Sequence, residues 1–407
     1  MNLAATDDPS SLRPENLPAP RRGERFRVLF VTGYSLGFRT LASQFEQYTA
    51  QRDDVEAVHL RLQLPPRLEW AGKVLARARG WDLAGWRRLR LWAAHLPGVI
   101  ARHTPPDRFD AAILTTQGIA LGMRRVKAAF GLPYAVYIDT TAAQYARDLG
   151  GSRIPEQLCV RADGRVFGDA DLIAGMSRWS LDSVRDDYGV PESKLLVVHN
   201  SVPVPANIIP RPESVAGAPV RLAIVGNGWI RKGGDRLLRW HQERWKDRAE
   251  LHVFGADVPI DRSLTGVVWH GRVEHARLVN DLLPSMDIFV LPTRNDMSPW
   301  AVVEAAGRGL PVVSSRLGAI HEIVDHGRTG FLCAPTDDGE YIRAIESLMP
   351  DPMLRRSMGQ AAHRHMLAEF SPDGNYGRLI DRMRAIASAA GPGRSSGAAH
   401  AGTASGR

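Results

Sequence analysis

Short apolar segments alternate with helical patterns along residues 25–205. Each segment is aliphatic or β-branched without polar alternation and is followed by small or polar residues; the segments are RVLFVTG, AAILTTQ, YAVYID, DLIAGMS and KLLVVHNS. Buried parallel strands that are joined by helical crossovers have this pattern. Residues 25–205 are therefore predicted to form a Rossmann-like domain.

The same alternation restarts after a break that is rich in proline. The break contains Pro203, Pro205, Pro210, Pro212 and Pro219, and residues 206–219 are predicted to be a linker. The segments VRLAIVG, ELHVFG, VVWHG, DIFVLP, PVVSS and GFLCAP follow it. The chain is thus predicted to be an α/β protein with two doubly wound parallel sheets, the second over residues 220–370. Ligands of such sheets bind at the carboxyl ends of the strands, so the two edges are expected to face a common cleft.

The two ends of the chain differ from this core. Residues 1–24 are rich in Pro, Asp and Arg and are predicted to be a flexible arm. A helical pattern runs from Pro372 to Ala390, and residues 391–407 have the low-complexity composition of a disordered tail.

The composition is that of a soluble globular protein with ample core: 44% of the residues are hydrophobic and 24% are charged. No apolar stretch reaches the roughly 18 residues of a membrane-spanning helix. No secretion signal is recognised at the N-terminus. Cys159 and Cys333 are the two cysteines, too few for a disulfide framework or a Cys-based zinc site. These observations predict a cytoplasmic protein.

The positive charge is concentrated in one segment. The formal net charge is +8, and residues 61–103 hold nine Lys and Arg against two acids, together with four of the ten tryptophans. An amphipathic helix on an anionic membrane is the preferred interpretation, with a patch made of Trp81, Trp86, Arg87, Arg88, Arg90 and Trp92. The alternative is a core-packed helix whose exposed face is rich in Arg. Nucleic acid is not expected as a partner because no binding module is recognised.

The first chemistry-bearing segment is IVGNGWIRKGGD. It leaves a strand, turns at Gly226 and Gly228, places Arg231 beside Lys232, and enters a helix at Gly233. Two cations beside a helix N-terminus form a site for a diphosphate. The alternative is a turn whose two cations are simply solvated.

The second segment begins where the strand DIFVLP ends. Asp296 and Glu304 bracket a helix start at Ser298 and Pro299, and carboxylates so placed suit the paired hydroxyls of a sugar. A third segment carries His321 and Glu322, which either reach the same cleft or cap and solvate their helix.

These segments together resemble a known family. The stretch VEAAGRGLPVVSSRLGAIHEIVDHGRTGFLCAP, with Asp296 eight residues before Glu304, is similar to the carboxy-terminal signature of the family 4 retaining glycosyltransferases, which have the GT-B architecture. The RKG turn, Phe254-Gly255, His270-Gly271 and the segment ending in VVHNSV follow the order of that family. The resemblance is strong over residues 170–370 and weak over 25–170.

The resemblance implies roles for several residues. Lys232 with Arg231 would hold the diphosphate of a nucleotide-sugar donor, Glu304 would bind the ribose, and Asp296 would contact the donor sugar. Backbone amides over Ser298, Pro299, Trp300 and Ala301 would cover the sugar and phosphates. Gly226 completes this site. The family's Gly-Gly loop is missing from the first domain, where VTGYSLGFRT has only Gly33 and Gly37, and these two glycines are the expected donor-binding residues there.

The chain also departs from the family pattern. Asn227 stands where Arg is frequent, so Arg231 is expected to substitute. Pro299-Trp300 replaces Phe-Gly, which predicts a narrower sugar pocket, and Gly307 replaces Ala. Asp139 stands where a His is common; it either orients acceptor or sugar, or caps the helix near Thr141. The expected catalytic residues are therefore Asp139, Asp296 and Lys232.

The implied reaction is transfer of a sugar from a nucleotide diphosphate to a lipid-linked or polysaccharide acceptor with retention of configuration. No metal and no cofactor are expected, because the two cations neutralise the diphosphate. Two alternatives stay open: a related nucleotide-sugar enzyme, such as an epimerase or phosphorylase, and an inactive membrane-docked scaffold.

Overall fold

The computed structural model describes residues 25–33, 36–62, 67, 77–78, 81–103, 108–150, 156–208, 218–258 and 260–390. The predicted arm (1–24), the predicted tail (391–407) and residues 209–217 of the predicted linker lie outside the described residues.

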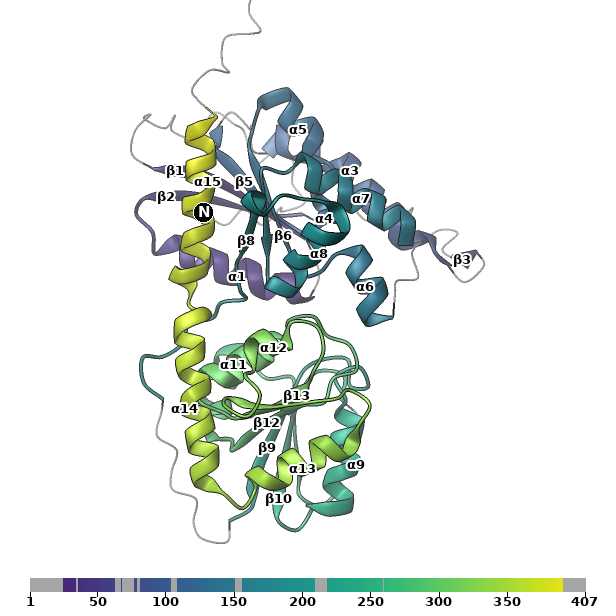
Figure 1. Ribbon diagram of the computed structural model, residues 1–407, viewed down its shortest axis with the longest axis vertical. Helices are drawn as coiled ribbons and strands as arrows, with labels where there is room; N and C mark the ends of the chain where they lie inside the picture. The colour runs from purple at the N-terminus through teal and green to yellow at the C-terminus, as the bar shows by residue number, and fades with distance from the viewer. Residues whose placement is uncertain are drawn as a thin grey trace, which may run out of the picture.

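The first half of the chain is built around a parallel sheet (Figure 1). Its six strands stand in the order β2 (Val55–Arg61), β1 (Phe26–Thr32), β5 (Ala111–Thr115), β6 (Tyr134–Ile138), β7 (Leu172–Gly175) and β8 (Leu195–Val197). Along β1, Val28 and Phe30 enter one core and Leu29 and Val31 enter another, because successive side chains of a strand point to opposite faces. Burial of both faces explains the unbroken apolar runs.

Helices cover both faces of this sheet. They are α1 (Leu36–Ala50), α3 (Leu83–His103), α4 (Gln117–Ala120), α5 (Met123–Phe130), α6 (Ala142–Leu149), α7 (Glu156–Asp169), α8 (Arg178–Tyr188) and the 3-10 turn η3 (Glu192–Lys194). A short antiparallel pair, β3 (Arg77–Ala78) with β4 (Trp81–Asp82), precedes α3.

The second half contains another parallel sheet of six strands. They stand in the order β11 (Val267–Gly271), β10 (Ala249–Phe254), β9 (Val220–Val225), β12 (Ile288–Leu291), β13 (Val312–Ser315) and β14 (Gly330–Cys333). Numbered along the chain, this is the 3-2-1-4-5-6 order of a dinucleotide-binding sheet, with its switch point between β9 and β12.

The second sheet is also covered on both faces. The covering elements are α9 (Gly234–Arg244), α10 (His275–Arg277), the π-helical turn η4 (Leu278–Leu282), η5 (Leu283–Ser285), α11 (Trp300–Gly307), α12 (Ile320–Ile323) and α13 (Asp338–Leu348). Trp240, Trp245 and Tyr341 are among the largest fully buried side chains of this core. The expected α/β architecture with two Rossmann-like sheets is present.

The last helices run along both halves of the molecule (Figure 1). α14 (Pro352–Glu369) packs in the second core, and α15 (Arg378–Ala389) places Leu379, Ile380 and Met383 in a core of the first sheet. The π-helical turn η6 (Asp373–Gly377) joins them. Its Tyr376 hydroxyl donates to the Ser201 carbonyl at 2.9 Å and accepts the Ser201 N–H at 3.1 Å. The chain passes between the two halves once after β8 and once at η6, and these hydrogen bonds join the two passages.

None of the helices within the described ranges combines the length and the apolar content that crossing a bilayer requires.

Candidate active site

The switch point of the second sheet brings the predicted donor residues together. Lys232 follows β9, Asp296 follows β12, and these two strands are neighbours. The Lys232 ammonium contacts the Asp296 carboxylate directly, and Arg231 Nη1 lies 3.4 Å from the same Asp296 oxygen. Lys232 and Asp296 keep only 12% of their side-chain surface exposed, so this is a mostly buried ion cluster. The three residues that sequence reasoning placed in one site are therefore in contact.

The Arg231 side chain contacts Asn227, the residue that stands where the family pattern frequently has Arg. Its Nη1 donates to the Asn295 carbonyl at 2.9 Å, and its Nη2 donates to the Asn227 carbonyl at 3.4 Å. The guanidinium thus reaches the start of the turn at Gly226, where φ is +150°. The substitution of Arg231 for the missing arginine stays a prediction.

The RKG turn is fixed to the neighbouring loop by Thr293 and Arg294. The Arg294 amide and the Thr293 hydroxyl both donate to the Arg231 carbonyl, at 2.8 and 3.1 Å. Arg294 also forms a two-point ion pair with Asp235 at 2.6 and 2.8 Å. Gly233 caps α9 with φ +77°, and a Cβ there would collide with the Pro292 carbonyl, so glycine is required for this close approach.

Glu304 lies in the second turn of α11 and is 4% exposed. His275 Nε2, at the start of α10, lies 2.7 Å from Glu304 Oε1. Since a carboxylate only accepts hydrogen bonds, the imidazole is the donor. This bond raises the pKa of His275. The ribose residue expected from the sequence is thus buried at the same end of the sheet and already has one partner.

The expected sugar-covering amides lie at the start of α11. The helix begins at Trp300, with Pro299 in the N-cap position. Asn200, which is fully buried, donates from Nδ2 to the Ser298 carbonyl at 3.1 Å and lies 3.2 Å from the Ser298 hydroxyl. The Trp300 side chain packs against a core of each sheet. Residues from both sheets thus hold this loop.

Asp139 lies at the carboxyl end of β6, on the first sheet. Burial raises its pKa to about 6; two backbone N–H groups act in the opposite direction, and the charge of Asp296 adds to the increase. The negative charge of Asp296 therefore acts on Asp139 across the boundary between the sheets. Thr141, not Asp139, caps α6, since its hydroxyl accepts the Gln144 N–H at 3.1 Å. The capping alternative for Asp139 is wrong.

The two glycines of the first domain that were expected at the donor site, Gly33 and Gly37, lie near the switch point of its sheet. Gly33 directly follows β1, and its N–H donates to the Thr115 hydroxyl, at the end of β5, at 3.2 Å. Gly37 is the second residue of α1. Both therefore stand at the edge that carries Asp139.

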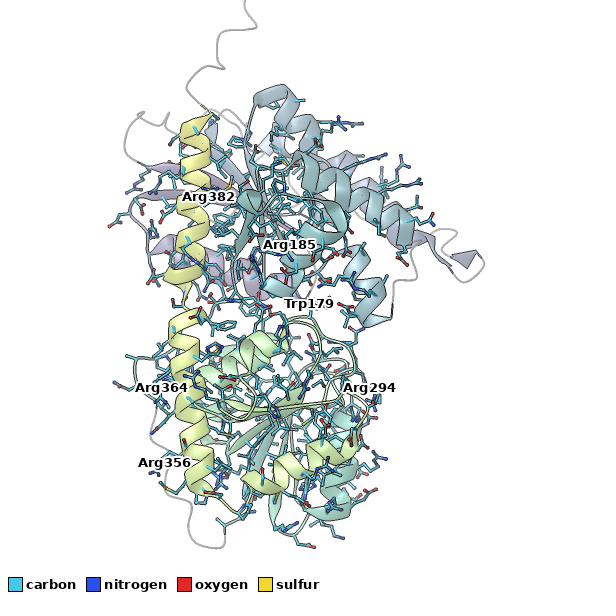
Figure 2. The ribbon with its side chains drawn as sticks, viewed as in Figure 1. Trp179, Arg185, Arg294, Arg356, Arg364 and Arg382 are labelled. Carbon is cyan, nitrogen blue, oxygen red and sulfur yellow. The ribbon has the colours of Figure 1, made fainter. Side chains whose placement is uncertain are left out.

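Glu322 bonds to the other half of the molecule instead of capping its own helix. Its two carboxylate oxygens accept the N–H groups of Arg178 and Trp179, each at 2.8 Å, in the first turn of α8. Ser177 caps the next N–H of that turn, on Ser180, at 3.0 Å. Figure 2 shows Trp179 at the junction of the two halves. Asn295, next to Asp296, also crosses the junction and donates to the Leu149 carbonyl at 3.1 Å.

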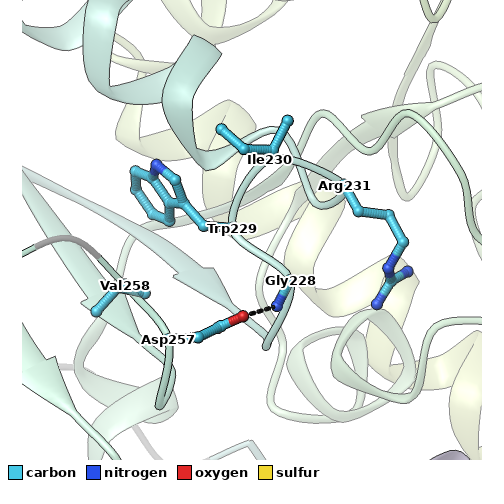
Figure 3. Close-up of a pocket in the computed structure, with 6 residues that line it drawn as sticks. All are labelled: Gly228, Trp229, Ile230, Arg231, Asp257 and Val258. Atoms are coloured by element: carbon cyan, nitrogen blue, oxygen red, sulfur yellow. Dashed lines mark hydrogen bonds between the residues drawn. The ribbon is translucent and has the colours of Figure 1, made fainter.

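An open pocket of about 670 Å³ adjoins the RKG turn (Figure 3). Gly228, Trp229, Ile230 and Arg231 line one side of it, and Asp257 and Val258 line the other. Asp257 accepts the Gly228 N–H at 2.6 Å and so joins the two loops. The Arg231 side of the turn therefore opens onto this pocket.

Comparison with known proteins shows which folds and sequences this chain resembles. Residues 219–351 match the family model described as "Glycosyl transferases group 1". Sucrose-phosphate synthase from Thermosynechococcus elongatus superposes with a TM-score of 0.70 over 90% of this chain and 100% of that one, at 14% identity. Anabaena HepE, solved in complex with UDP, gives a TM-score of 0.64 over 88% of this chain and 100% of that one, also at 14% identity. The chain has the GT-B fold.

Relatives by sequence share a shorter stretch with this GT-B chain. Glycogen synthase of Mycobacterium tuberculosis is 32% identical over 109 residues, which are 27% of this chain and 26% of that protein. The D-inositol 3-phosphate glycosyltransferase of Streptomyces avermitilis is 34% identical over 85 residues, 21% of this chain and 18% of that protein. The chain thus spans about a quarter or less of the length of these curated relatives.

The membrane patch of this GT-B chain is only partly described. Trp81, Trp86, Arg87 and Arg88 belong to β4 and α3, but their side chains lie outside the described residues. Arg90 is exposed, and Trp92 is partly buried against a core of the first sheet. The position of Trp92 therefore agrees with the alternative of a core-packed helix. Membrane contact by the segment stays a prediction.

Three residues of the site were not anticipated from the sequence: His275, Asn200 and Asn295. Each acts through a side-chain contact between elements that are distant in the chain. The sequence signal for His275 was its position shortly after His270-Gly271, at the end of a strand. Within the described residues, no group of three or more His, Cys, Asp or Glu is arranged to hold a metal ion. Metal independence stays a prediction.

Proposed function

We propose that this chain is a glycosyltransferase that moves a sugar from a nucleotide-diphospho-sugar to an acceptor hydroxyl, with retention of configuration and without a metal ion. The observation that carries the proposal is the convergence of Lys232, Arg231 and Asp296 at the switch point of the second sheet. The match of residues 219–351 to glycosyl transferases group 1 supports it. The UDP complex of Anabaena HepE supports a nucleotide as the donor's carrier.

Each residue of the site would have a separate role in binding the donor or in transferring the sugar. Lys232 and Arg231 would stabilise the diphosphate as it departs, and the amides at the start of α11 would add preorganised donors. Glu304 would hold the ribose, and Asp296 a hydroxyl of the donor sugar. The bond from the anomeric carbon to the phosphate oxygen breaks as the bond to the acceptor oxygen forms on the same face. The departing phosphate takes the acceptor proton, so no carboxylate acts as a nucleophile.

Asp139 would face the reacting sugar from the first domain. Its pKa of about 6 leaves it ionised at neutral pH, so it can accept a hydrogen bond from a sugar or acceptor hydroxyl. The residues that bridge the two sheets would keep water out of the cleft during transfer.

A thermal-shift screen of UDP-, GDP- and ADP-sugars tests the proposal. The cognate donor is expected to raise the unfolding midpoint, because a ligand that binds only the folded state stabilises it by mass action. Product analysis with labelled donor should then show a glycosidic product of unchanged anomeric configuration, formed equally well with EDTA. An isomerised or phosphorolysed sugar would favour another nucleotide-sugar enzyme, and absence of any donor binding would contradict the transferase.

A lipid-linked or polysaccharide acceptor made at an anionic membrane surface is part of the same proposal. The supporting observations are the basic, Trp-rich segment 61–103 and the exposed Arg90. Anionic vesicles are expected to pellet the protein at low salt and to release it at high salt, since headgroup attraction is screened. Failure to pellet at low salt would contradict the membrane part and leave the transferase proposal standing.

A further inference from the structure

The carboxylate of Glu304 is held by a residue that the family pattern does not include. His275 Nε2 lies 2.7 Å from Glu304 Oε1. The Glu304 side chain is 6% exposed and the His275 side chain is 56% exposed, so a solvent-facing imidazole contacts a buried acid. A polar group that is buried so deeply needs a hydrogen-bond partner.

The two residues come from neighbouring crossovers of the second sheet. α10 follows β11 after a short turn, and α11 follows β12 after the loop of residues 292–299, so both helices are entered from the ligand-binding edge of the sheet. The crossovers also touch farther along, where Arg308 donates to the Val279 carbonyl at 2.9 Å and to Asn280 Oδ1 at 3.0 Å. The pair is thus built on a fixed helix contact.

The bond persists across protonation states. Nε2 carries a proton both in imidazolium and in one neutral tautomer, so His275 can donate to Glu304 either way. The bond uses one lone pair of Oε1 and restricts rotation of the carboxylate. The second lone pair of Oε1 and both lone pairs of Oε2 stay available to accept from a ligand.

We propose that His275 is a positioning residue of the ribose subsite, which orients the Glu304 carboxylate toward the vicinal hydroxyls of a ribonucleoside diphosphate. This inference rests on the proposed donor site. A carboxylate held in one plane accepts from both hydroxyls at once, whereas a rotating one does not. His275 therefore contributes to the preference for ribose over 2′-deoxyribose without touching the sugar itself.

Calorimetric titration tests this with UDP, GDP and ADP and their 2′-deoxy forms. The wild-type protein is expected to bind one ribonucleotide about tenfold more tightly than its 2′-deoxy form. His275→Ala should reduce that preference to threefold or less, while His275→Gln, whose amide can donate from a similar position, should largely keep it. Arg277→Ala is the matched control, because Arg277 is exposed on the same short helix.

The outcomes separate the two proposals. A wild-type preference in His275→Ala would overturn the role of His275 and leave the donor site intact. If Glu304→Ala also keeps the preference, or if the wild-type protein binds none of the three nucleotides, the donor site itself is wrong. A midpoint of thermal unfolding within a few degrees of wild type shows that each variant is folded.

Discussion

The Lys232→Met variant is expected to lose about a hundred- to a thousandfold in kcat/KM. Removing one preorganised group that faces developing charge typically has this effect, and Lys232 would face the departing diphosphate. Steady-state kinetics with the donor found in the thermal-shift screen gives the value. Lys246→Met is the matched control, since Lys246 is an exposed lysine of the same domain and should leave kcat/KM within about twofold.

A purely structural role for Lys232 predicts a different set of results. Without Lys232, Asp296 keeps Arg231 at 3.4 Å, so part of any loss could come from an acid that has lost its main partner. The double variant Lys232→Met with Asp296→Asn removes that unpaired charge. Recovery of activity in the double variant would contradict a diphosphate role for Lys232. Lys232→Arg keeps the charge and should retain more activity than methionine does.

The sheets of this protein were predictable because burial on both faces makes a strand visible as an apolar run. All six strands of the second sheet were anticipated in this way. β2 was missed in the first sheet, since Glu56, His59 and Arg61 interrupt its apolar residues. β2 is an edge strand that pairs on one side with β1, and edge strands tolerate polar residues. The missed strand is therefore an edge strand whose polar residues break the apolar run.

The donor site was predictable to the extent that strand ends specify it. Lys232 and Asp296 follow two strands that topology makes neighbours, and their contact follows from the strand order. The bond from His275 to Glu304 depends instead on how two crossover helices lie against each other. The bond from Asn200 to Ser298 depends on how the two halves of the chain pack. No local pattern in the sequence encodes either packing.

Glu322 illustrates the same limit. Its position in a short helix suggested either a cleft residue or a local cap. The structure gives it a capping role, but for α8 of the other half of the chain. A carboxylate at a helix N-terminus is favourable because it meets unpaired N–H groups and the positive end of the helix dipole. Here that interaction joins the two domains.

Glu322→Ala is accordingly expected to lower kcat about ten- to a hundredfold while changing the Kd of a nucleoside diphosphate less than threefold. The variant removes two hydrogen bonds to a charged acceptor, each with a typical net contribution of about 1.5–3 kcal/mol, from the junction. The proposed donor residues Lys232, Asp296 and Glu304 all lie in the second domain, so donor binding should survive. Small-angle scattering should show a larger radius of gyration, and a larger share of donor should be hydrolysed as water enters the cleft.

Glu192 provides the control for this prediction. Its carboxylate pairs with the Arg178 side chain at 2.6 Å, on the same helix end, but it belongs to the first domain and joins nothing across the junction. Since exposed ion pairs contribute about 1 kcal/mol or less, Glu192→Ala should change kcat less than threefold. An equal loss in both variants would mean that the end of α8, not the junction, matters. If Glu322→Ala weakens donor binding as much as turnover, Glu322 acts inside the donor site and does not hold the domains together.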